Sequence, residues 1–292
     1  MEREIVAVGE VLWDLLPSGR KMGGAPANFA CHARALGAGS RLITRVGDDD
    51  LGREILEWLP RHGLPTDTVE VDREAPTGTV SVELGLDGQP RFTIHENVAW
   101  DRIEAGPRAL AAAAGADAVC FGSLAQRGEA SRQAIQAVVQ ATRPGALRIF
   151  DVNVRPPFVD RDVIAASLGM ASVLKLNDQE LPLLAEMLGL AGGVREQMAE
   201  LSRRFELSAI ALTRGSQGSL VHRGGEWSDH PGEPVEVVDT VGAGDAFTAV
   251  LAVGLLSGWP LDAINRKANR VAAYVCSQPG ATPPLPESLL RD

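Results

Sequence analysis

The sequence is poor in cysteine. It contains 3 cysteines among 292 residues, Cys31, Cys120 and Cys276, and no Cys-x-x-Cys pair. An odd, scattered set is typical of free thiols in a reducing compartment rather than of a disulfide scaffold. Nothing near any of the three marks an activated thiol, so a catalytic cysteine is disfavoured and we expect free, buried thiols.

Long apolar runs are also missing. No uninterrupted run approaches the roughly 20 residues that a membrane-spanning helix needs. The N-terminal stretch MEREIVAVGE carries charges and then only a short apolar run, which does not fit a signal peptide. We therefore expect a cytoplasmic protein without a membrane partner.

Positive charge is in short supply. The chain has 28 Lys and Arg residues against 38 Asp and Glu residues, a formal net charge of -10. This balance argues against a nucleic-acid partner and against an anionic membrane surface. A hydrophobic content of 45% is ample for a core, and the length suits one large α/β domain, here residues 1–292.

Two common phosphate-binding motifs are absent. No Gly-x-x-x-x-Gly-Lys-Ser/Thr occurs, so a Walker-type loop is excluded. The Gly242-Ala243-Gly244 stretch is not a dinucleotide fingerprint, because Phe247 stands where the third glycine is required. A nucleotide-dependent oxidoreductase is therefore disfavoured.

Strand and helix patterns alternate along most of the chain. Short apolar runs bounded by turn residues are typical of buried parallel strands, and the segments between them are typical of helices. Strands are expected at 5–9, 41–47, 118–122, 147–153, 172–177 and 209–213, and helices at 26–36, 51–62, 103–114, 129–142, 160–168, 178–189 and 195–205. The alternation predicts an α/β fold with a doubly wound, mainly parallel central sheet flanked by helices.

Two stretches interrupt this rhythm. Residues 77–86 and 91–95 alternate polar and apolar side chains around a turn, which predicts a hairpin with one solvated face. We expect a small β lid formed by about 11–20 and 76–97. Its apolar face needs cover from substrate closure or from a second subunit, which allows a homodimer through the lid. Residues 218–229 predict a further hairpin.

The central feature is the stretch from Asp239 to Phe247. A β-branched run at 235–238 predicts a strand, and 246–256 predicts a helix that ends near Gly258. The loop Gly242-Ala243-Gly244 then presents backbone N–H groups at a helix N-terminus, which favours an anion. A carboxylate beside such a loop, Asp245, is suited to take a proton from an attacking hydroxyl. The competing interpretation is a tight turn followed by a helix cap.

Other polar residues follow the ends of predicted strands. Asp14 is expected just beyond the first strand, and Gly23-Gly24 precede a helix with Asn28 in its first turn. Because strand ends of a doubly wound sheet share one edge, these residues are expected to form one site. Alternatives remain for each of them, since Asp14 also fits a turn and Asn28 a solvated position. The strand-end residues that complete the set are Asn153, Arg155, Asn177, Glu180, Thr213, Arg214 and Gly215.

Five motifs in register resemble those of one enzyme family. The segments 23–28 and 239–245 resemble the two signatures of the ribokinase-like (PfkB) carbohydrate kinases. Asn177-Asp178-Gln179-Glu180 resembles the family's Asn-x-x-Glu element, and 213–215 and 280–283 resemble its nucleotide-side and C-terminal elements. The segments 9–19 and 151–155 make the chain most similar to bacterial fructokinases.

The resemblance implies a role for each motif. Asp245 is the implied base, and Gly242, Ala243 and Gly244 are the implied phosphate-holding loop. The implied sugar-binding residues are Asp14, Gly23, Gly24, Asn28 and Arg155. Asn177 and Glu180 are implied to organise Mg²⁺, through water, and Thr213, Gly215 and Asn269 to lie along ATP. Candidate ligands for a monovalent cation such as K⁺ are Asp239, Val241 and Gly280.

The resemblance implies an ATP-dependent kinase that phosphorylates a primary hydroxyl of a small sugar, with fructose expected first. Ribose, 2-keto-3-deoxygluconate and a nucleoside are the alternatives within the family. A sugar- or nucleotide-binding regulator without activity is the alternative of a different class. The intact Asp245 and its anion-binding loop argue against the regulator.

Overall fold

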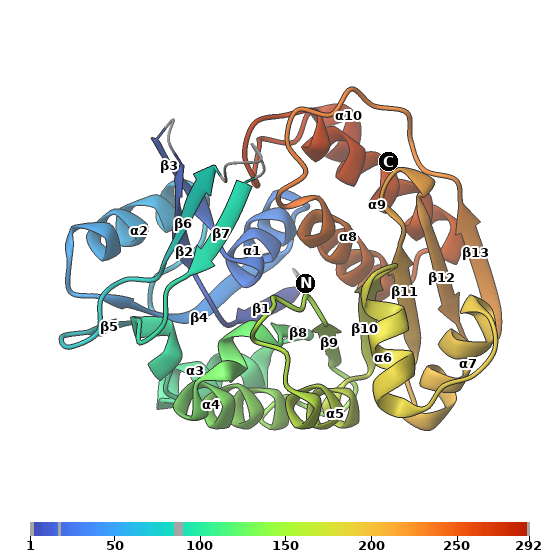
Figure 1. Ribbon diagram of the computed structural model, residues 1–292, viewed down its shortest axis with the longest axis horizontal. Helices are drawn as coiled ribbons and strands as arrows, with labels where there is room; N and C mark the ends of the chain where they lie inside the picture. Colours follow the sequence, from blue (N-terminus) through green and yellow to red (C-terminus); the bar gives the residue numbers. More distant parts are fainter. Residues whose placement is uncertain (1–2, 17–18, 85–89, 291–292) are drawn as a thin grey trace.

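The large sheet confirms the predicted fold class. A computed structural model describes residues 3–16, 19–84 and 90–290 (Figure 1). The sheet has nine strands in the order β13-β12-β11-β10-β9-β8-β1-β4-β5, and every pairing from β11 to β5 is parallel. The strands are β1 Glu4–Val8, β4 Gly39–Gly47, β5 Val69–Asp72, β8 Ala118–Gly122, β9 Leu147–Asp151, β10 Val173–Asn177, β11 Ala209–Thr213, β12 Ser219–Arg223 and β13 Glu226–His230.

Helices cover both faces of this sheet, because alternate residues of each strand point to opposite sides. In β1, Ile5 and Ala7 face α1, α2, α8, α9 and α10, whereas Val6 and Val8 face α3 to α7. The first layer is α1 Ala25–Ala35, α2 Asp50–Arg61, α8 Ala243–Ser257, α9 Leu261–Cys276 and α10 Glu287–Leu290. The second layer is α3 Pro107–Gly115, α4 Glu129–Gln140, α5 Arg161–Met170, α6 Glu180–Leu188 and α7 Val194–Arg204.

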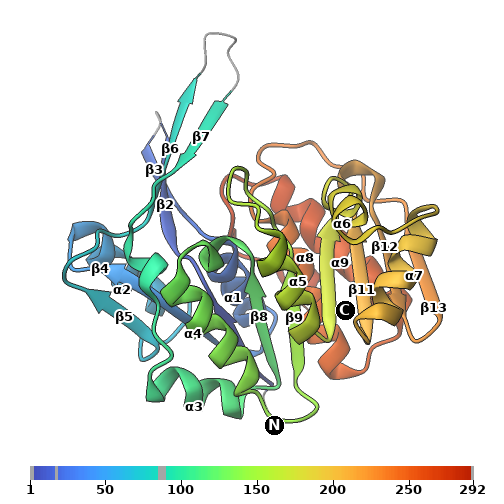
Figure 2. The ribbon, with the colours of Figure 1, turned by 60° about the horizontal axis from the view of Figure 1, so that its bottom comes forward.

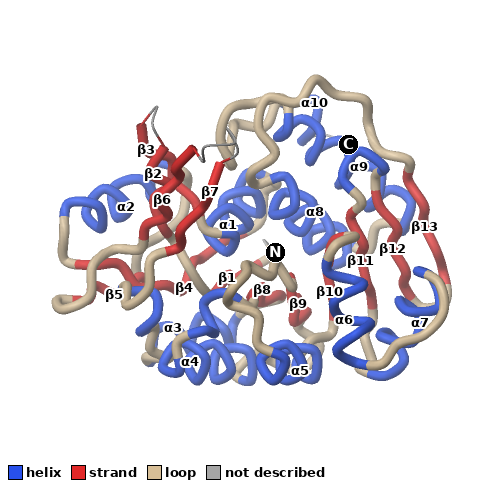
Figure 3. The backbone as a smooth tube through the Cα atoms, in the orientation of Figure 1, coloured by secondary structure: helices blue, strands red, loops and turns tan. Residues whose placement is uncertain are grey.

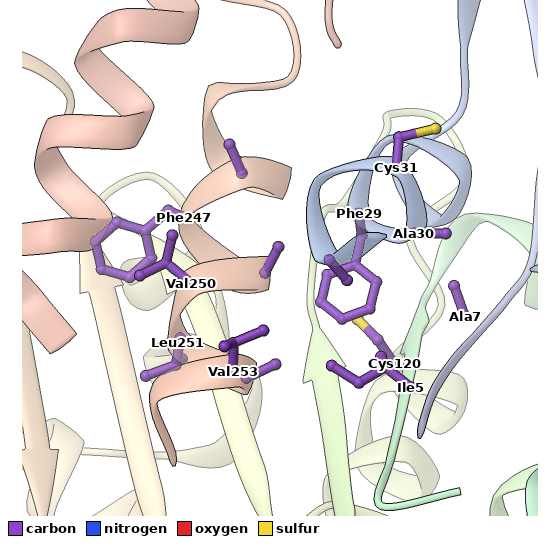
Figure 4. Packing of buried hydrophobic residues seen from close by; sticks show 14 of the residues in the cluster. Ile5, Ala7, Phe29, Ala30, Cys31, Cys120, Phe247, Val250, Leu251 and Val253 are labelled. Carbon is purple, nitrogen blue, oxygen red and sulfur yellow. The ribbon is translucent and has the colours of Figure 1, made fainter. Parts of the chain in front are cut away.

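Helices α1 and α8 are central to the first layer. Figure 4 shows Phe29 of α1 pointing toward Cys120 and Ile5 on the sheet, while Phe247 and Val250 project from α8. The exposed fraction of Phe29 is 2%, so its ring is removed from water. The two helices pack against each other, which places their N-termini side by side at the carboxyl edge of the sheet.

A second, smaller sheet stands apart from the first and is called the small sheet below. Its order is β3-β2-β6-β7, and only the β2–β6 pairing is parallel. Its strands are β2 Leu12–Leu16, β3 Gly19–Gly23, β6 Thr79–Leu84 and β7 Pro90–Ile94. Figure 2 shows β6 and β7 projecting from the body of the protein, as predicted for a hairpin. Its turn, 85–89, lies outside the described residues.

The small sheet is fastened to helix α2 at its base. The Trp13 indole N–H donates to the carbonyl of Leu51, at 3.1 Å. Arg20 forms an ion pair with Glu54 of the same helix. Asp49 caps the N-terminus of α2 by accepting from the N–H of Gly52, at 2.8 Å.

Three local predictions are wrong. Residues 235–238 form a loop, not a strand, because no strand of the described chain pairs with them and Val237 and Val238 are 59% and 61% exposed. Asp14 lies within β2 of the small sheet rather than beyond the end of β1. The helix expected from 103 begins at Pro107, because 3₁₀ helix η1, Ala99–Arg102, and a short extended segment precede it.

Figure 3 distinguishes by colour the strands of the two sheets, in red, from the helices, in blue. Helix α9 had no counterpart among the predicted elements.

In the described residues, no helix combines the length and apolar character needed to cross a membrane. All three cysteines are free thiols; Cys31 and Cys120 are buried and Cys276 is half-buried.

Substitution of Phe29 by Ala should lower the free energy of unfolding by about 3–5 kcal/mol, because it leaves a cavity between α1 and the sheet. Denaturant unfolding followed by circular dichroism measures the loss. Val237→Ala is the control, with an expected change below about 0.5 kcal/mol, since its side chain is 59% exposed. Equal losses in the two variants would contradict this description of the core.

Candidate active site

The loop before α8 has the form of an anion-binding turn. We call residues 239–244 the anion loop. Gly242 has a φ of 82°, and a Cβ at this position would collide with the backbone of Ala281, so only glycine fits. Helix α8 begins directly afterwards, at Ala243, and its first N–H groups carry the positive end of the helix dipole. The predicted strand before the loop is absent, whereas the predicted helix is present and begins three residues earlier than expected, at Ala243.

Asp245 lies in the first turn of α8, and its carboxylate is held from the neighbouring helix. The Asn28 side-chain amide donates to Asp245 Oδ2 at 2.8 Å. Burial, followed by the charge of Asp151, raises the pKa of Asp245 to about 6. The Asn28 hydrogen bond and the Lys175 and Arg155 charges oppose this rise. Asp245 is therefore ionised at neutral pH but closer to its pKa than an ordinary aspartate, as suits a general base.

A buried ion pair lies beneath the anion loop. Lys175 Nζ donates to Asp151 Oδ1 at 3.1 Å, and both side chains are over nine-tenths buried. The Thr248 hydroxyl contacts the other Asp151 oxygen at 2.9 Å and the Gly244 carbonyl at 2.9 Å. A Cβ on Gly244 would lie 3.1 Å from Lys175 Nζ, so the ammonium sits directly against the loop.

Lys175 was not among the predicted site residues. Burial alone lowers the pKa of Lys175, but Asp151, Glu180 and Asp245 outweigh burial and raise it, so the ammonium stays charged. Its signal in the sequence is a lysine inside the apolar run 173–176. A charge in a buried strand requires a partner, and the partner became visible only in the fold.

Glu10 is a second residue that the sequence did not mark. Its side chain is 3% exposed, and Oε2 has no hydrogen-bond partner. Burial is the largest cause that raises the pKa of Glu10 to about 7, with the charge of Asp245 adding to the rise and that of Arg155 opposing it. Glu10 therefore holds its proton over a wider pH range than an exposed glutamate and limits the negative charge around Asp245.

The residues predicted to bind a sugar come together at this edge. Asp14 Oδ2 lies over Gly23, where a Cβ would be only 2.6 Å away. Gly24 has a φ of 106° and leaves no room for a Cβ beside the Glu10 carbonyl. Burial, then Asp239, raises the pKa of Asp14 to about 6, while Lys21 and Arg155 lower it. The exposed Arg155 thus acts electrostatically on Asp14 and on Asp245.

A small recess beside Asp245 adjoins the residues predicted to bind a sugar. It is lined by residues of α1, β8 and the end of β9, with Asn153 at its rim. Asn153 has a φ of 38°, which is uncommon for a residue with a side chain, although asparagine adopts it more readily than most. The sequence singled out this residue at the end of its strand.

The two residues predicted for Mg²⁺, Asn177 and Glu180, are joined by hydrogen bonds. Asn177 Oδ1 accepts from the N–H groups of Gln179 and Glu180, both at 2.9 Å, and so holds the turn that leads into α6. Glu180 is 2% exposed, and its two oxygens accept from Val154 N at 3.0 Å and Asn177 N at 2.8 Å. Burial raises the pKa of Glu180 and Lys175 opposes the rise. These oxygens keep lone pairs for water-mediated contact with a cation.

The residues predicted along ATP divide between an exposed edge and a buried layer. Thr213 lies opposite Asn177 in the β10–β11 register, and Gly215 follows it in the exposed 3₁₀ turn η3, Gly215–Gln217. Asn269 is 7% exposed in α9, and its amide donates to Ser219 Oγ at 2.7 Å. Thr213 and Gly215 can therefore meet a ligand at the surface, whereas Asn269 supports that surface from below.

The three residues predicted for a monovalent cation also lie together. Asp239 Oδ1 accepts from the N–H of Val241, and Oδ2 accepts from the N–H of Gly280, both at 3.1 Å. Lys21 Nζ of β3 also contacts Oδ2, at 3.1 Å. Burial alone raises the pKa of Asp239, but these donors outweigh burial and lower it.

His32 supports the anion loop from behind. Its ring nitrogen Nε2 lies 2.9 Å from the carbonyl oxygen of Ala281, whose backbone packs on Gly242. Burial lowers the pKa of His32, so the ring is neutral near pH 7, and the contact with a carbonyl oxygen requires the proton to be on Nε2. This residue was also not predicted.

The sequence matches a known family over nearly its whole length. The model described as "pfkB family carbohydrate kinase" matches residues 18–288. A fructokinase of Klebsiella pneumoniae is 33% identical over 266 residues, which cover 87% of this chain and 85% of the relative.

Solved structures share the fold. An uncharacterized sugar kinase from Pyrococcus horikoshii in complex with ATP has a TM-score of 0.82 and 30% identity, and the match covers 95% of this chain and 94% of that chain. A fructokinase double mutant from Vibrio cholerae, bound to fructose, ADP and potassium ion, has a TM-score of 0.80 and 24% identity, with 99% and 97% covered.

Asp245→Asn should stabilise the folded protein increasingly as pH rises. Burial raises the pKa of Asp245 from 3.8 to about 6, so the wild type loses stability as pH rises from 3.8 through 6, whereas the amide does not ionise. The difference in unfolding free energy should be small near pH 4 and reach about 3 kcal/mol above pH 7. Denaturant titrations across this range measure it, and a difference that does not change with pH would contradict the assignment.

Proposed function

Because the chain belongs to the pfkB family of carbohydrate kinases, we propose that it transfers the γ-phosphate of ATP to a primary hydroxyl of fructose. The observation that carries the proposal is the position of Asp245. Its carboxylate is held by Asn28 at the N-terminus of α8, directly beside the anion loop. A phosphotransferase needs a base for the acceptor hydroxyl next to a cradle for the transferred phosphate, and this arrangement provides both.

In the proposed reaction, the hydroxyl oxygen of the sugar attacks the γ-phosphorus while its proton passes to Asp245. The bond between the γ-phosphorus and the bridging oxygen breaks, and ADP leaves with that electron pair. The products are ADP and a sugar phosphate. In-line placement and charge stabilisation carry most of the catalysis in such reactions, so the fixed position of the Asp245 carboxylate matters as well as its basicity.

The anion loop and Lys175 would stabilise the charge of the transferred phosphate. The N–H groups at Gly242, Ala243 and Gly244 would donate to its oxygens, aided by the dipole of α8. The Lys175 ammonium lies against Gly244 from the opposite side of the loop. Since Asp151 shares that ammonium, Lys175 would act on the phosphate at longer range through the loop rather than by direct contact.

The charges at the sugar end favour a neutral polyol. Asp14, Gly23, Gly24 and Asn28 would hold its hydroxyl groups, because carboxylate and amide groups accept and donate hydrogen bonds to hydroxyls. Asp14 and Asp245 both lie at this end, and a sugar acid such as 2-keto-3-deoxygluconate would be repelled by them. Arg155, which is exposed, would complete the sugar contacts.

We further propose ATP and Mg²⁺ as the nucleotide and metal. Among the described residues, no three His, Cys, Asp or Glu side chains come together to hold a metal ion. Mg²⁺ prefers water and phosphate oxygens with few protein contacts, which suits a site where Glu180 and Asn177 act through water. Bound Mg²⁺ would neutralise charge on the ATP phosphates. Thr213 and Gly215 would lie along the nucleotide, with Asn269 supporting them.

The small sheet would act as a lid over the sugar. It carries Asp14 and is joined to the body through α2 and through the Lys21–Asp239 contact. A lid that excludes water protects ATP from hydrolysis. We also propose that two copies associate through this sheet, where Leu15 is 37% exposed, and that the enzyme acts in the cytoplasm.

Asp245→Asn should lower kcat by about 10³-fold, because the amide cannot accept the hydroxyl proton, while the Kd for ATP stays within about threefold. A coupled assay for ADP measures kcat, and calorimetry measures ATP binding. Asp162→Asn, an exposed position on α5, is the matched control and should retain wild-type rates. Near-normal turnover by Asp245→Asn would remove the base from this proposal.

A panel of acceptors should give the highest kcat/KM for fructose, by at least about tenfold over ribose, 2-keto-3-deoxygluconate and a nucleoside. The ADP assay, run with saturating ATP and Mg²⁺, ranks them. A higher value for another acceptor would replace fructose and leave the kinase activity intact. If ADP is not formed with any of the acceptors, the result would favour a binding protein without activity.

A further inference from the structure

Lys21 of β3 reaches across from the small sheet to the anion loop, at 3.1 Å from Asp239. We propose that Lys21 is a positioning residue for phosphate transfer, whose ammonium takes the place that a monovalent cation would otherwise occupy at Asp239. The inference rests on the proposed kinase function. It predicts an enzyme that does not depend on potassium, although potassium is bound in the fructokinase of Vibrio cholerae.

The surroundings of Asp239 do not fit a bound metal cation as they stand. Oδ1 already accepts from the Val241 N–H, and Oδ2 accepts from the Gly280 N–H and from Lys21. The ion pair is partly shielded, since the side-chain exposures are 41% for Lys21 and 20% for Asp239. A potassium ion on Oδ2 would have to displace the ammonium or share the oxygen with it, at the cost of repulsion between two positive charges.

The contacts of Asp239 connect this charge to the phosphate cradle. Val241, which donates to one oxygen, immediately precedes Gly242 of the anion loop. Gly280, which donates to the other, immediately precedes Ala281, whose backbone packs on Gly242. A cation at Asp239 therefore keeps the carboxylate ionised and holds both sides of Gly242 in place. Lys21 provides that cation from within the chain.

Lys21 also faces the sugar end of the site. In the β2–β3 register it lies opposite Asp14, and its charge acts on that carboxylate. The other charges around it are Asp239, which disfavours ionisation of Asp14, and Arg155, which favours it. One ammonium is thus placed between the carboxylate proposed for the sugar and the carboxylate that orients the anion loop. A solvent-borne potassium ion could not join the two in this way, because it is not attached to the strand that carries the sugar contact.

Arg20, the next residue along the strand, is a matched control. It points to the other side of the small sheet, where it pairs with Glu54 and lies 5.3 Å from the centre of the Trp13 ring. Its side chain is 45% exposed, close to the value for Lys21. Substitution of Arg20 removes one positive charge from the same strand without touching Asp239.

The test compares wild type, Lys21→Met, Arg20→Met and Asp239→Asn in potassium-free choline buffer and in potassium chloride at the same ionic strength. Wild type and Arg20→Met should turn over equally in both buffers. Lys21→Met should lose about tenfold in kcat without potassium, the effect of removing one partly shielded ion pair, and regain most of it with potassium. Asp239→Asn should lose activity in both buffers, because it removes the anion that either cation needs.

Three outcomes would overturn the inference. Potassium dependence of the wild type would show that Lys21 does not replace the cation. A loss in Lys21→Met that potassium does not restore would assign Lys21 a merely structural role. Unchanged activity of Lys21→Met in both buffers would remove it from the site. A charge-retaining variant, Lys21→Arg, should remain independent of potassium, which separates the role of charge from the shape of the lysine.

A second readout does not need activity. Without substrates, potassium should raise the midpoint of thermal unfolding of Lys21→Met, but not of the wild type, Arg20→Met or Asp239→Asn, because a ligand that binds only the folded state stabilises it. If no acceptor is phosphorylated, the proposed function fails while this measurement still tests the cation site. If phosphorylation is found but potassium stabilises the wild type as much as Lys21→Met, only the inference about Lys21 fails.

Discussion

Repulsion among carboxylates is the constraint around which this site is built. Asp14, Asp151, Asp239 and Asp245 meet at one edge of the sheet, beside a loop shaped for a phosphate. Each added negative charge makes ionisation of its neighbours harder, and burial strengthens the effect. The N-terminus of α8 and separate cations offset this repulsion, and each cation lies opposite a different carboxylate.

The two lysines differ in how far they are buried, and therefore in what they can do. Lys175 is enclosed with Asp151, and leaving either charge alone in that position would cost several kcal/mol. This pair is a permanent part of the scaffold under Gly244. Lys21 is partly open to solvent and bridges the small sheet and the anion loop. The first lysine fixes the cradle, whereas the second couples the cradle to the strand that carries Asp14.

Local patterns were reliable where the local sequence decides the structure. The apolar runs of β1, β8 and β10 are buried strands because both faces of a parallel sheet are covered by helices. The β-branched run at 235–238 was wrongly predicted to be a strand, because a strand also needs a neighbouring strand to pair with. The backbone N–H of Val238 instead donates to the Cys276 carbonyl at the end of α9. A related reason explains why the sequence did not predict Glu10, His32 and Lys175. The role of a buried polar side chain depends on neighbouring groups that are distant in sequence.

The sequence by itself determined the doubly wound sheet, the glycine turn into α8 and the carboxylate that follows it, because periodicity and glycine content act over a few residues. The resemblance of its motifs also determined the family. Only the tertiary structure decided what surrounds that carboxylate. Asn28 and Asp245 are 217 positions apart, and Lys21 and Asp239 are 218 apart, yet each pair is in contact. Such contacts depend on how helices and sheets pack, and electrostatic interactions depend on distance in space rather than along the chain.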